Sequence, residues 1–332
     1  MLKKIILPIL LSTLLAVAGC GSTGGGTNQA SSAPKTAKDF FPQGVTLLVG
    51  FDPGGIVDTG ARLVQPYLQT ALGVPVVVQN MSGGGGITAA NYEYRQKPDT
   101  STFLTSYLPA LPLGQIMGGG QFDLSKMTPL GGVFGNSPVV IIAKKGSPYN
   151  GLESLQKANK TLTASVAGIG SSGAWMALAF LHGINNVNVK AVPFTGGATG
   201  SAATIGGSVD LSSTTIVEAK HLIGSGAAQG VLQFGPQPSP DLPGVESIAK
   251  VGKPDETFDT VLGFTAPPGM PAAEAKVFED ALAQAEKSTE LTSKAQSAGL
   301  SIAPQDATAW GKTINQYVNM INDNKAMLGA FK

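Results

Sequence analysis

The stretch VTLLVGFDPGG (Val45–Gly55) is followed at once by a helical pattern of apolar residues over Ile56–Leu72. The combination predicts a buried strand, a tight glycine turn and a helix whose first turn faces that glycine turn. The first turn of a helix has backbone N–H groups without partners and carries a partial positive charge. Because glycine lets a backbone approach a ligand closely, the segment is suited to bind a carboxylate or a phosphate. An ordinary connection between a strand and a helix has the same pattern, so both interpretations stay open for this segment alone.

A second segment of the same kind lies downstream. The sequence GIGSS (Gly168–Ser172) follows a predicted strand, Leu162–Val166, and precedes a helix that we expect to begin near Ala174. Two helix starts that face one cleft would hold a carboxylate from both sides, and the hydroxyl groups of Ser171 and Ser172 would add hydrogen bonds. The pair of turns is a stronger indication of an anion site than either turn alone.

Short apolar runs alternate with helical patterns along most of the chain, which predicts an α/β protein with parallel sheets covered by helices on both faces. The expected strands are Val45–Val49, Val74–Gln79, Thr102–Thr105, Val139–Ala143, Leu162–Val166, Val189–Pro193, Val209–Ser212 and Ala228–Phe234. The expected helices are Ile56–Leu72, Ile87–Arg95, Leu152–Asn159, Ala174–His182, Ala198–Ile205 and Val217–Gly224. Towards the C-terminus, two long helical patterns with no strand between them cover Ala272–Ala298 and Ala307–Met327.

The body is large enough for two lobes. Boundaries between them are expected in Val139–Lys145 and in Val261–Pro268, where apolar strands end in charged or turn residues. A chain that leaves one lobe and later returns makes two crossings, which form the hinge of a clamshell binding protein. We therefore expect residues 44–142 and 264–332 to form lobe 1, and residues 143–263 to form lobe 2.

The N-terminus has the pattern of an export signal. Lys3 and Lys4 precede an apolar run that is shorter than the roughly 20 residues of a membrane span. Its ending, Val17–Cys20, resembles the lipobox of bacterial lipoproteins, in which the cysteine becomes the acylated first residue. Cys20 is the only cysteine of the chain, so it has no partner for an internal disulfide. We expect residues 1–19 to be a lipoprotein signal peptide and Cys20 to carry the lipid; an unlipidated signal peptide is the alternative.

Residues 20–43 are expected to tether the body to the lipid. Most of this stretch, Gly21–Lys38, is rich in Gly, Ser, Thr, Asn, Gln and Ala, a composition typical of flexible linkers. The net charge of the chain is +1, which excludes the basic surface that nucleic-acid binding requires. The expected protein is an extracytoplasmic monomer, anchored to the bacterial cell membrane or facing the periplasm.

Residues with catalytic or metal-binding chemistry do not group into a recognisable motif. The two histidines, His182 and His221, fall on predicted helices without metal-ligand spacing. The sequence has no GxSxG elbow and no GxxxxGK[ST] loop, and it has no GxGxxG followed by an acidic residue at the required distance. We expect neither an enzyme nor a metal or cofactor.

Two features have both a binding and a structural interpretation. The run NMSGGGG (Asn80–Gly86) follows a strand and precedes a helix, so it either contacts a ligand or connects the two elements tightly. Asp58 and Arg62 are four residues apart, with the acid first, an order that favours an ion pair within the helix.

A series of ordered motifs extends over nearly the whole body. The motifs are FDPGGIVDTGARL (Phe51–Leu63), LGVPVVVQNMSGGGG (Leu72–Gly86), GIGSSG (Gly168–Gly173), VPFTGGA (Val192–Ala198), IGGSVD (Ile205–Asp210), DLPGVESIAKVG (Asp241–Gly252) and GFTAPPGMP (Gly263–Pro271). Together and in this order they resemble the solute receptors of tripartite tricarboxylate transporters, often called Bug receptors. The resemblance implies a two-lobed α/β periplasmic-binding-protein fold of the type II clamshell kind, each lobe a sheet flanked by helices.

The resemblance also implies a ligand site in the cleft between the lobes, where both glycine turns hold a carboxylate, partly through ordered waters. Carried to this chain, the residues of the two turns are Gly54, Gly55 and Asp58, and Gly168, Gly170, Ser171 and Ser172. Further ligand-binding positions that it indicates are Asp52, Thr105, Ser106, Phe194 and Asp210. Asp210 has an alternative interpretation as a structural carboxylate at the end of a strand.

Several of these positions depart from the pattern of the family. Asp52 stands where a proline or a small residue is usual, Val57 where a small hydroxyl residue is common, and Ile169 where a polar residue is frequent. Ala174 replaces a common histidine and Phe194 a common tyrosine. The pocket has thereby lost polar groups and gained a carboxylate at its mouth, which predicts a ligand with an apolar body, and an ammonium group that reaches Asp52 is a further option.

The resemblance implies a receptor that captures a small organic carboxylate and delivers it to the membrane subunits of a tripartite tricarboxylate transporter. Two alternatives stay open. One is a sensory receptor that reports its ligand to a signalling partner, which the sequence does not separate from transport. The other is an extracytoplasmic enzyme of carboxylate metabolism, against which the missing acid–base constellation argues.

Overall fold

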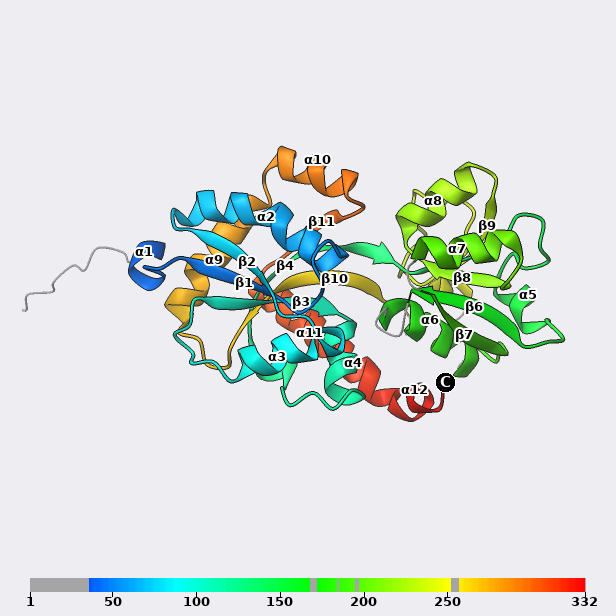
Figure 1. Cartoon of the computed structure of the whole chain (residues 1–332), viewed down its shortest axis with the longest axis horizontal. Helices are drawn as coiled ribbons and strands as arrows, with labels where there is room; N and C mark the ends of the chain where they lie inside the picture. Colours follow the sequence, from blue (N-terminus) through cyan, green and yellow to red (C-terminus); the bar gives the residue numbers. More distant parts are fainter. Residues whose placement is uncertain (1–35, 168–171, 184, 195–196, 252–256, 332) are drawn as a thin grey trace, which may run out of the picture. The chain divides into compact units, whose positions relative to one another are not determined.

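The computed structural model describes residues 36–331 apart from 168–171, 184, 195–196 and 252–256 (Figure 1). The predicted signal peptide, the predicted lipidation site Cys20 and most of the expected tether lie outside the described residues. The described part of the chain belongs to one unit, Lys35–Lys332, which contains two β-sheets. No helix in this part is long and apolar enough to cross a membrane.

The first sheet, here called sheet A, has six strands in the order β11-β4-β10-β3-β1-β2. These strands are β1 (Val45–Val49), β2 (Val76–Asn80), β3 (Thr102–Leu108), β4 (Thr128–Pro138), β10 (Asp259–Ala266) and β11 (Ser301–Gln305). The strand β1 pairs in parallel with β2 and β3, whereas β10 is antiparallel to both β3 and β4, and β11 is antiparallel to β4. Sheet A is therefore mixed, which corrects the expectation of parallel sheets.

The second sheet, sheet B, has five strands in the order β7-β6-β8-β5-β9. These strands are β5 (Val140–Lys144), β6 (Leu162–Ala167), β7 (Val189–Phe194), β8 (Leu211–Thr214) and β9 (Ala228–Gln233). The strand β6 pairs in parallel with β7 and β8, and β5 is antiparallel to β8 and β9. Each sheet thus has three parallel strands on one side and antiparallel strands on the other, and the α/β class expected from the sequence is confirmed.

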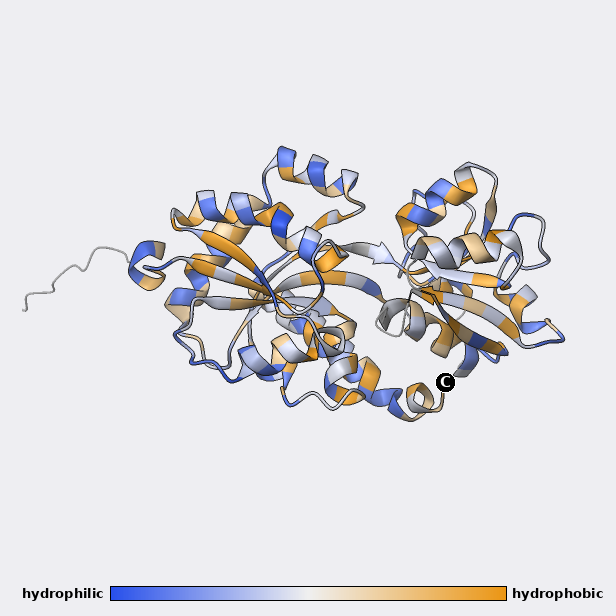
Figure 2. Cartoon of the chain, viewed as in Figure 1, coloured by the Kyte–Doolittle hydropathy of each residue, from blue (hydrophilic) through white to orange (hydrophobic). Residues whose placement is uncertain are grey.

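Helices flank the two sheets (Figure 1). They are α1 (Ala37–Phe40), α2 (Ile56–Leu72), α3 (Ile87–Tyr94), α4 (Ala110–Ile116), α5 (Leu152–Gln156), α6 (Ser172–Gly183), α7 (Gly197–Gly206), α8 (Ile216–Gly224), α9 (Ala272–Ala285), α10 (Thr289–Ser297), α11 (Ala307–Asp323) and α12 (Lys325–Ala330). Short 3-10 turns are η1 (Gly84–Gly86), η2 (Leu124–Lys126) and η3 (Ile248–Val251). In Figure 2 hydrophobic residues run along the strands, whereas α10 is mostly hydrophilic.

The segment Val45–Leu72 folds as predicted. The strand β1 leads through a glycine turn into α2, which begins at Ile56 and ends at Leu72. Gly73 stops the helix because it adopts a left-handed conformation, with φ of +67°, that glycine accepts without strain. Val57, Ala61, Val64 and Leu68 follow the helical repeat and are buried in the core of sheet A.

The chain passes between the sheets at two neighbouring points. It leaves sheet A after Pro138 and returns to it at Asp259. Both crossing segments are hydrogen-bonded to Phe234, which follows β9: the Phe234 N–H donates to the oxygen of Val139 at 2.9 Å, and the Phe258 N–H donates to the oxygen of Phe234 at 2.9 Å. The lobe boundaries stay a prediction, but β5 assigns residues 140–142 to sheet B and β10 assigns residues 259–263 to sheet A, so both crossings fall a few residues before those boundaries.

The C-terminal region differs from the two uninterrupted helices that the pattern predicts. The first of them, α9, ends at Ala285, and Ser288 then caps α10, because its hydroxyl accepts a hydrogen bond from the N–H of Leu291 at 3.2 Å. The strand β11 follows α10, so the expectation of no strand in this region is wrong. Asp306 then caps α11 by accepting from the N–H of Ala309 at 2.7 Å. The second predicted helix, Ala307–Met327, begins as expected but is interrupted at Asn324, which lies between α11 and α12.

Candidate functional site

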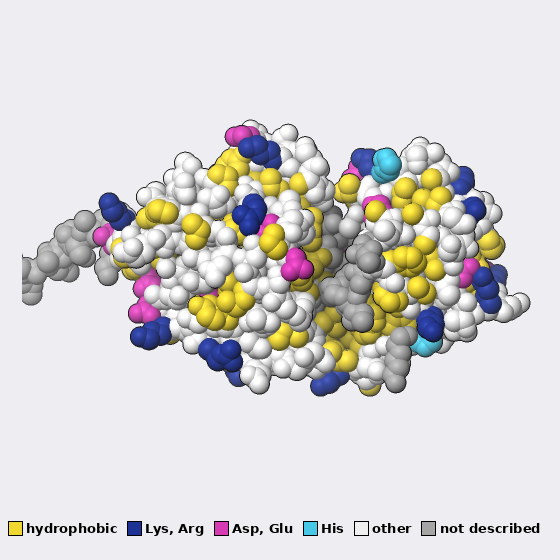
Figure 3. Space-filling view, in the orientation of Figure 1, with side chains coloured by type: hydrophobic (Ala, Val, Ile, Leu, Met, Phe, Trp, Pro, Cys, Tyr) yellow, Lys and Arg dark blue, Asp and Glu magenta, His cyan; other side chains and the backbone are white. Residues whose placement is uncertain are grey.

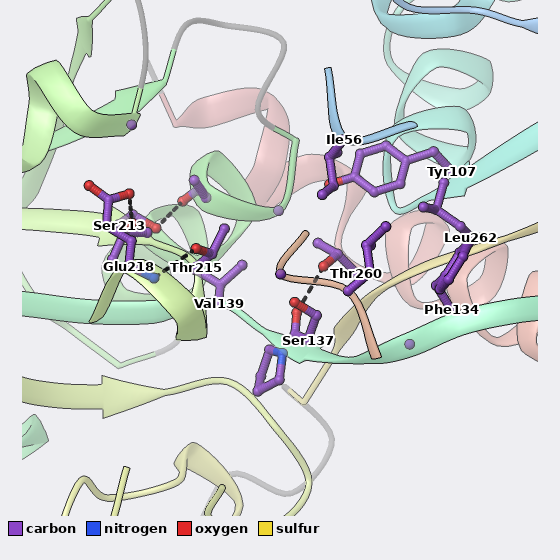
Figure 4. Close-up of a pocket in the computed structure, with 18 residues that line it drawn as sticks. Ile56, Tyr107, Phe134, Ser137, Val139, Ser213, Thr215, Glu218, Thr260 and Leu262 are labelled. Carbon is purple, nitrogen blue, oxygen red and sulfur yellow. Dashed lines mark hydrogen bonds between the residues drawn. The ribbon is translucent and has the colours of Figure 1, made fainter. Parts of the chain in front are cut away.

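A cavity of about 300 Å³ is lined by residues of both sheets and of the helices that follow their strands (Figure 4). Its first wall belongs to sheet A and includes Tyr107 of β3, Phe134 of β4 and Leu262 of β10. Its second wall includes Ser213 of β8 and Glu218 of α8. A pocket of this size that opens between two sheets is the leading candidate for a small-molecule site.

Four helices begin at this cavity. Its lining includes Ile56, the first residue of α2, Ala174 in the first turn of α6, Gly197, the first residue of α7, and Thr215, the N-cap of α8. Each of these helices has nine residues or more and directs backbone N–H groups and the positive end of its dipole towards its start. No Lys or Arg is among the described lining residues. The attraction for an anion therefore comes from the backbone of these helices.

The wall from sheet A is largely apolar. Figure 4 shows Tyr107, Phe134 and Leu262 together on one side of the close-up, with Ile56 next to the Tyr107 ring. The Tyr107 ring also packs edge-on against Phe51, with centroids 5.6 Å apart. Burial raises the pKa of Tyr107 to about 12, against the lowering effect of a hydrogen bond to Thr260, so its hydroxyl stays protonated at neutral pH. This wall suits the hydrocarbon part of a ligand.

The wall from sheet B carries hydroxyl groups and one carboxylate. The Ser213 hydroxyl donates to the backbone oxygen of Ala174 at 3.2 Å, and the Thr214 hydroxyl donates to Oε2 of Glu218 at 2.6 Å. The Thr215 hydroxyl accepts from the N–H of Glu218 at 3.3 Å. These bonds orient the polar groups, and Figure 4 shows Ser213, Thr215 and Glu218 on the side opposite the aromatic residues.

The first glycine turn lies immediately before the cavity lining. Gly54 and Gly55 are exposed, and Gly54 has a φ of +83°, which favours glycine. Neither glycine is among the lining residues, whereas the next residue, Ile56, is. The turn therefore reaches the edge of the cavity, and the ligand-binding role of both glycines stays a prediction.

The side chain of Asp58 is hydrogen-bonded to the backbone of this turn. Its side chain is buried, and Oδ2 accepts from the Gly54 N–H at 2.9 Å. The Nε of Arg62 and the Nδ2 of Asn80 donate to the same carboxylate, at 2.9 to 3.0 Å. Burial by itself raises the pKa of Asp58, but the hydrogen bonds from Arg62, from that N–H and from Asn80 hold it below its usual value. The structure thus shows the ion pair within the helix, in which the Asp58 carboxylate positions the turn.

Thr105 and Ser106 are buried in β3 and are not among the cavity-lining residues. The Ser106 hydroxyl is 2.7 Å from that of Thr265 in the neighbouring strand, so it joins β3 to β10. The Thr105 hydroxyl has no hydrogen-bond partner among the described residues. The next residue, Tyr107, lines the cavity, and sequence reasoning missed it. The alternation of strand side chains would have suggested it as a neighbour of Thr105 on the same face.

Most of the second glycine turn, namely Gly168, Ile169, Gly170 and Ser171, lies outside the described residues, and Ser172 is the first residue of α6. The residues that follow, Gly173 and Ala174, line the cavity. Among the apolar positions expected near the ligand, Ala174 is therefore at the cavity, whereas Val57 is buried in the core of sheet A. The binding roles assigned to this turn stay predictions.

Phe194 and Asp210 are not among the lining residues: Phe194 is the last residue of β7, and Asp210 immediately precedes β8. Phe194 is half-buried at the end of β7. The Asp210 carboxylate accepts from the backbone N–H of Thr163 at 3.0 Å and from Nζ of Lys160 at 2.6 Å. Burial acts to raise the pKa of Asp210, but these partners hold it below its usual value. This geometry matches the structural interpretation of Asp210 as a carboxylate that joins neighbouring segments.

Asp52 belongs to a separate, more open hollow of about 480 Å³. Asp52 is exposed there, next to Ser82 and the glycines of the NMSGGGG run. A methyl group on Gly50 would come within 2.7 Å of the Cα of Gly86, so the two loops are in close backbone contact. The glycine run therefore makes a tight connection.

On the face shown in Figure 3, Lys and Arg are spread out rather than gathered into a patch.

Sequence reasoning did not select Ser213, Thr215, Glu218, Phe134 or Leu262, which line the cavity. They lie on strands and helices far apart in the chain, and no local motif marks them. Among the described residues, no group of three or more His, Cys, Asp or Glu side chains could hold a metal ion.

The sequence of this chain is similar to a known protein family. A model of the "tripartite tricarboxylate transporter family receptor" matches residues 60–330. A UPF0065 protein of Bordetella pertussis is 28% identical over 258 residues, which are 75% of this chain and 79% of that protein. Protein BugT of the same organism is 26% identical over 266 residues, 78% of this chain and 80% of BugT.

Solved structures show the same fold. A TctC solute-binding protein from Polaromonas has a TM-score of 0.72 at 18% identity, covering 84% of this chain and 98% of that one. MatC from Rhodopseudomonas palustris, with bound malate, has a TM-score of 0.68 at 23% identity, covering 86% and 98%. Another R. palustris protein, with adipate, has a TM-score of 0.68 at 22% identity, covering 86% and 97%.

Proposed function

We propose that this chain, which belongs to the family of tripartite tricarboxylate transporter receptors, binds a small organic carboxylate in the cavity between its two sheets. The family is one of solute-binding receptors, so the receptor function that the motifs implied is confirmed, and an enzymatic function is not. The location that fits such a receptor is outside the cytoplasm.

The observation that carries the ligand class is the convergence of the starts of α2, α6, α7 and α8 on one cavity without a described Lys or Arg in its lining. Free N–H groups at helix starts donate hydrogen bonds to a carboxylate, and the helix dipoles favour its negative charge. Phosphate would meet the same donors, but it lacks the hydrocarbon that the wall of Tyr107, Phe134 and Leu262 accommodates. An acid with an apolar body uses both kinds of wall.

Two structural relatives support this ligand class. The malate-bound and adipate-bound proteins share the fold and hold organic dicarboxylates. The four methylene groups of adipate show that a hydrocarbon chain is compatible with the fold.

Within the site, the glycine turns take the roles that the motifs implied. We assign the backbone of Gly54 and Gly55, and that of Gly168, Gly170, Ser171 and Ser172, to the carboxylate, because Ile56 and Gly173 next to these turns line the cavity. Asp58 acts on the ligand through the turn that it holds. Thr105, Ser106, Phe194, Asp210 and Asp52 lie outside the cavity lining, which argues for indirect roles.

The remaining parts of the proposal concern membrane and partner. A lipid on Cys20 would hold the receptor at the cell membrane, and the part of the expected tether before α1 would give it reach, since α1 and the buried Phe41 already belong to the folded body. The receptor, as a monomer, would deliver its ligand to the membrane subunits of a tripartite tricarboxylate transporter. Loss of acyl labelling in a Cys20→Ser variant tests the anchor.

A thermal-shift screen tests the ligand class. The panel contains malate, adipate and 3-phenylpropanoate, each beside its amide, together with neutral sugars. A ligand at 100 times its Kd adds about 2.7 kcal/mol to the free energy of unfolding, which raises the Tm by several degrees at roughly 2–4 °C per kcal/mol. We expect acids to raise the Tm and amides to leave it unchanged. Stabilisation by sugars with no response to any acid would overturn the proposal.

A variant that fills the cavity locates the site. Ala174→Trp places an indole at the start of α6, inside the lining, and should weaken binding of any active acid at least a hundredfold, or about 2.7 kcal/mol. Ala272→Trp, on the exposed start of α9, is the matched control and should bind as the parent does. Unchanged binding by a folded Ala174→Trp protein would place the ligand elsewhere.

A further inference from the structure

The geometry points to an amino acid with an apolar side chain as the ligand, recognised through its ammonium group by Glu218. This inference rests on the proposed function and names the substrate class of the same cavity. It assigns Glu218 as a residue that determines specificity, and it transfers to Glu218 the role that the sequence offered to Asp52, which lies in a different hollow.

The first argument is the charge of the lining. Among the 18 described lining residues, Glu218 is the only Asp, Glu, Lys or Arg. Tyr107 is the other titratable group of the lining, and its raised pKa keeps it neutral. A dicarboxylate would place its second negative charge near Glu218 without any described Lys or Arg to compensate it, whereas an ammonium group would be attracted there.

The second argument is the direction of the Glu218 side chain. Its Oε2 accepts a hydrogen bond from the Thr214 hydroxyl at 2.6 Å, which orients the carboxylate. A methyl group on Gly197 would come within 3.1 Å of that oxygen, so the carboxylate lies against the start of α7. Its Oε1 accepts no hydrogen bond from the described residues and remains available to a ligand. The carboxylate is thus held in place with one oxygen unused.

The third argument is the match between the parts of the cavity and those of an amino acid. The ammonium and carboxylate of an amino acid are attached to one carbon atom, and here Glu218 lies beside the start of α7. Its ammonium group would bind Oε1 of Glu218, and its carboxylate would bind the N–H groups at the helix starts. The side chain would then point to Tyr107, Phe134 and Leu262, which Figure 4 shows on the opposite side.

The competing interpretation is that Glu218 is structural and only braces the starts of α7 and α8. A bracing residue would affect every ligand of the cavity to the same extent. A residue that binds ammonium would affect only ligands that carry one. The two interpretations therefore differ in how a Glu218 variant treats matched ligands.

The test uses two pairs of ligands that differ only in the amino group: L-leucine with 4-methylpentanoate, and L-phenylalanine with 3-phenylpropanoate. Isothermal titration calorimetry measures their Kd for the full chain, for Glu218→Gln and for Glu153→Gln. Glutamine keeps an oxygen that accepts from the Thr214 hydroxyl, so the fold is retained, and an unchanged Tm without ligand checks this. Glu153 is the matched control, because its side chain is 79% exposed and is not among the lining residues.

We expect the amino acid of at least one pair to bind the parent tenfold or more tightly than its deaminated partner. Glu218→Gln should remove this preference while the deaminated acid binds as before or more tightly, and Glu153→Gln should change neither. A preference that survives in Glu218→Gln, or an equal loss for both members of a pair, overturns the inference. Binding of malate or adipate without binding of either amino acid also overturns it and leaves the proposed function intact. If no acid of any kind binds, the proposed function itself fails.

Discussion

The two sheets differ in the kind of side chain that fills the interior beside them. Sheet A is packed with aromatic rings: Phe278 lies between Phe103 and Phe264, with centroids 4.8 and 5.5 Å away. Sheet B instead buries a chain of hydroxyl groups, in which Ser212 is hydrogen-bonded to Ser165 at 2.8 Å and lies 3.2 Å from the hydroxyl of Ser201.

The same contrast continues into the cavity. The wall from sheet A consists mainly of rings and aliphatic groups, together with the hydroxyl groups of Ser137 and Thr260, whereas the wall from sheet B offers hydroxyl groups, Glu218 and the starts of three helices. A receptor built from two similar α/β halves can thus divide the recognition of its ligand between the two halves. One half accommodates the hydrocarbon of a ligand and the other half recognises its charged groups. Each half can then be perturbed separately.

The largest expected effect concerns the packing of sheet A. Trp310 of α11 lies on Gly263 of β10, where an added methyl group would meet the indole ring at 2.5 Å and the backbone oxygen of Gly131 at 2.5 Å. Gly263→Ala should lower the free energy of unfolding by about 3 kcal/mol, because neither the ring nor the backbone can move away cheaply. Urea unfolding measures this loss.

The matched control lies on the other half. Gly206 is the last residue of α7, and a methyl group there would meet no atom within 4 Å. Gly206→Ala should change the free energy of unfolding by no more than about 0.5 kcal/mol. An equal loss in both variants would show that the dense aromatic packing of sheet A is not what makes Gly263 sensitive.

A second effect arises from an unpaired buried carboxyl on the side of sheet A. Glu93 of α3 is fully buried, and neither of its oxygens has a hydrogen-bond partner among the described residues. Burial raises the pKa of Glu93 from 4.5 to about 8. Between these two pH values the unfolded chain has released this proton and the folded chain keeps it. The contribution of Glu93 to stability therefore falls as pH rises from about 4.5 to about 8.

Replacing this group should remove the pH dependence. The glutamine of Glu93→Gln cannot ionise. The free energy of unfolding of this variant minus that of the parent should therefore be about 2 kcal/mol larger at pH 8 than at pH 5. Thermal unfolding at both pH values measures the change, with Glu153→Gln as the control for a lost surface carboxylate. A constant difference between parent and Glu93→Gln across this range would mean that Glu93 is ionised in the folded protein.

The smallest expected effect tests which wall of the cavity contacts the hydrocarbon part of the ligand. Ile56 lines the cavity on the side of sheet A and is 42% exposed, so Ile56→Ser should cost little stability. It should weaken binding of 4-methylpentanoate about three- to fivefold and that of the shorter propanoate less, because only the longer chain loses apolar contact. Ser213→Ala, on the wall from sheet B, should weaken both acids by a similar factor. The reverse pattern in titration calorimetry would assign the two walls the opposite roles.

Much of the fold could be read from local patterns. The helix α2 has the predicted bounds, and β1 agrees as well, since the apolar repeat, Gly55 and Gly73 all lie within that one segment. The strands β4 and β11 were missed, and β10 was recognised only as a strand that ends near a lobe boundary. Three glycines interrupt the apolar sequence pattern of β4, because Trp310 and β11 occupy the space that side chains would fill there. They are Gly131, Gly132 and Gly135.

The candidate site divides in the same way. The sequence indicated the starts of α2 and α6 at one cleft, and both line the cavity. It did not indicate Tyr107, Phe134, Ser213, Glu218 or Leu262, although these residues form the walls. It placed a carboxylate for the ligand at Asp52, whereas the carboxylate at the cavity belongs to Glu218.

The sequence by itself determined the strand–turn–helix units, the caps and the family, because each depends on residues within a few positions of one another or on motifs in fixed order. The tertiary structure alone decided the mixed sheets, the strand β11 and the two unlike walls of the cavity. These features arise when β4 pairs with β10, more than a hundred residues away, and when α8 begins beside α7. Such contacts are selected by packing and hydrogen bonding over the whole fold, and no local segment contains both of the partners that form them.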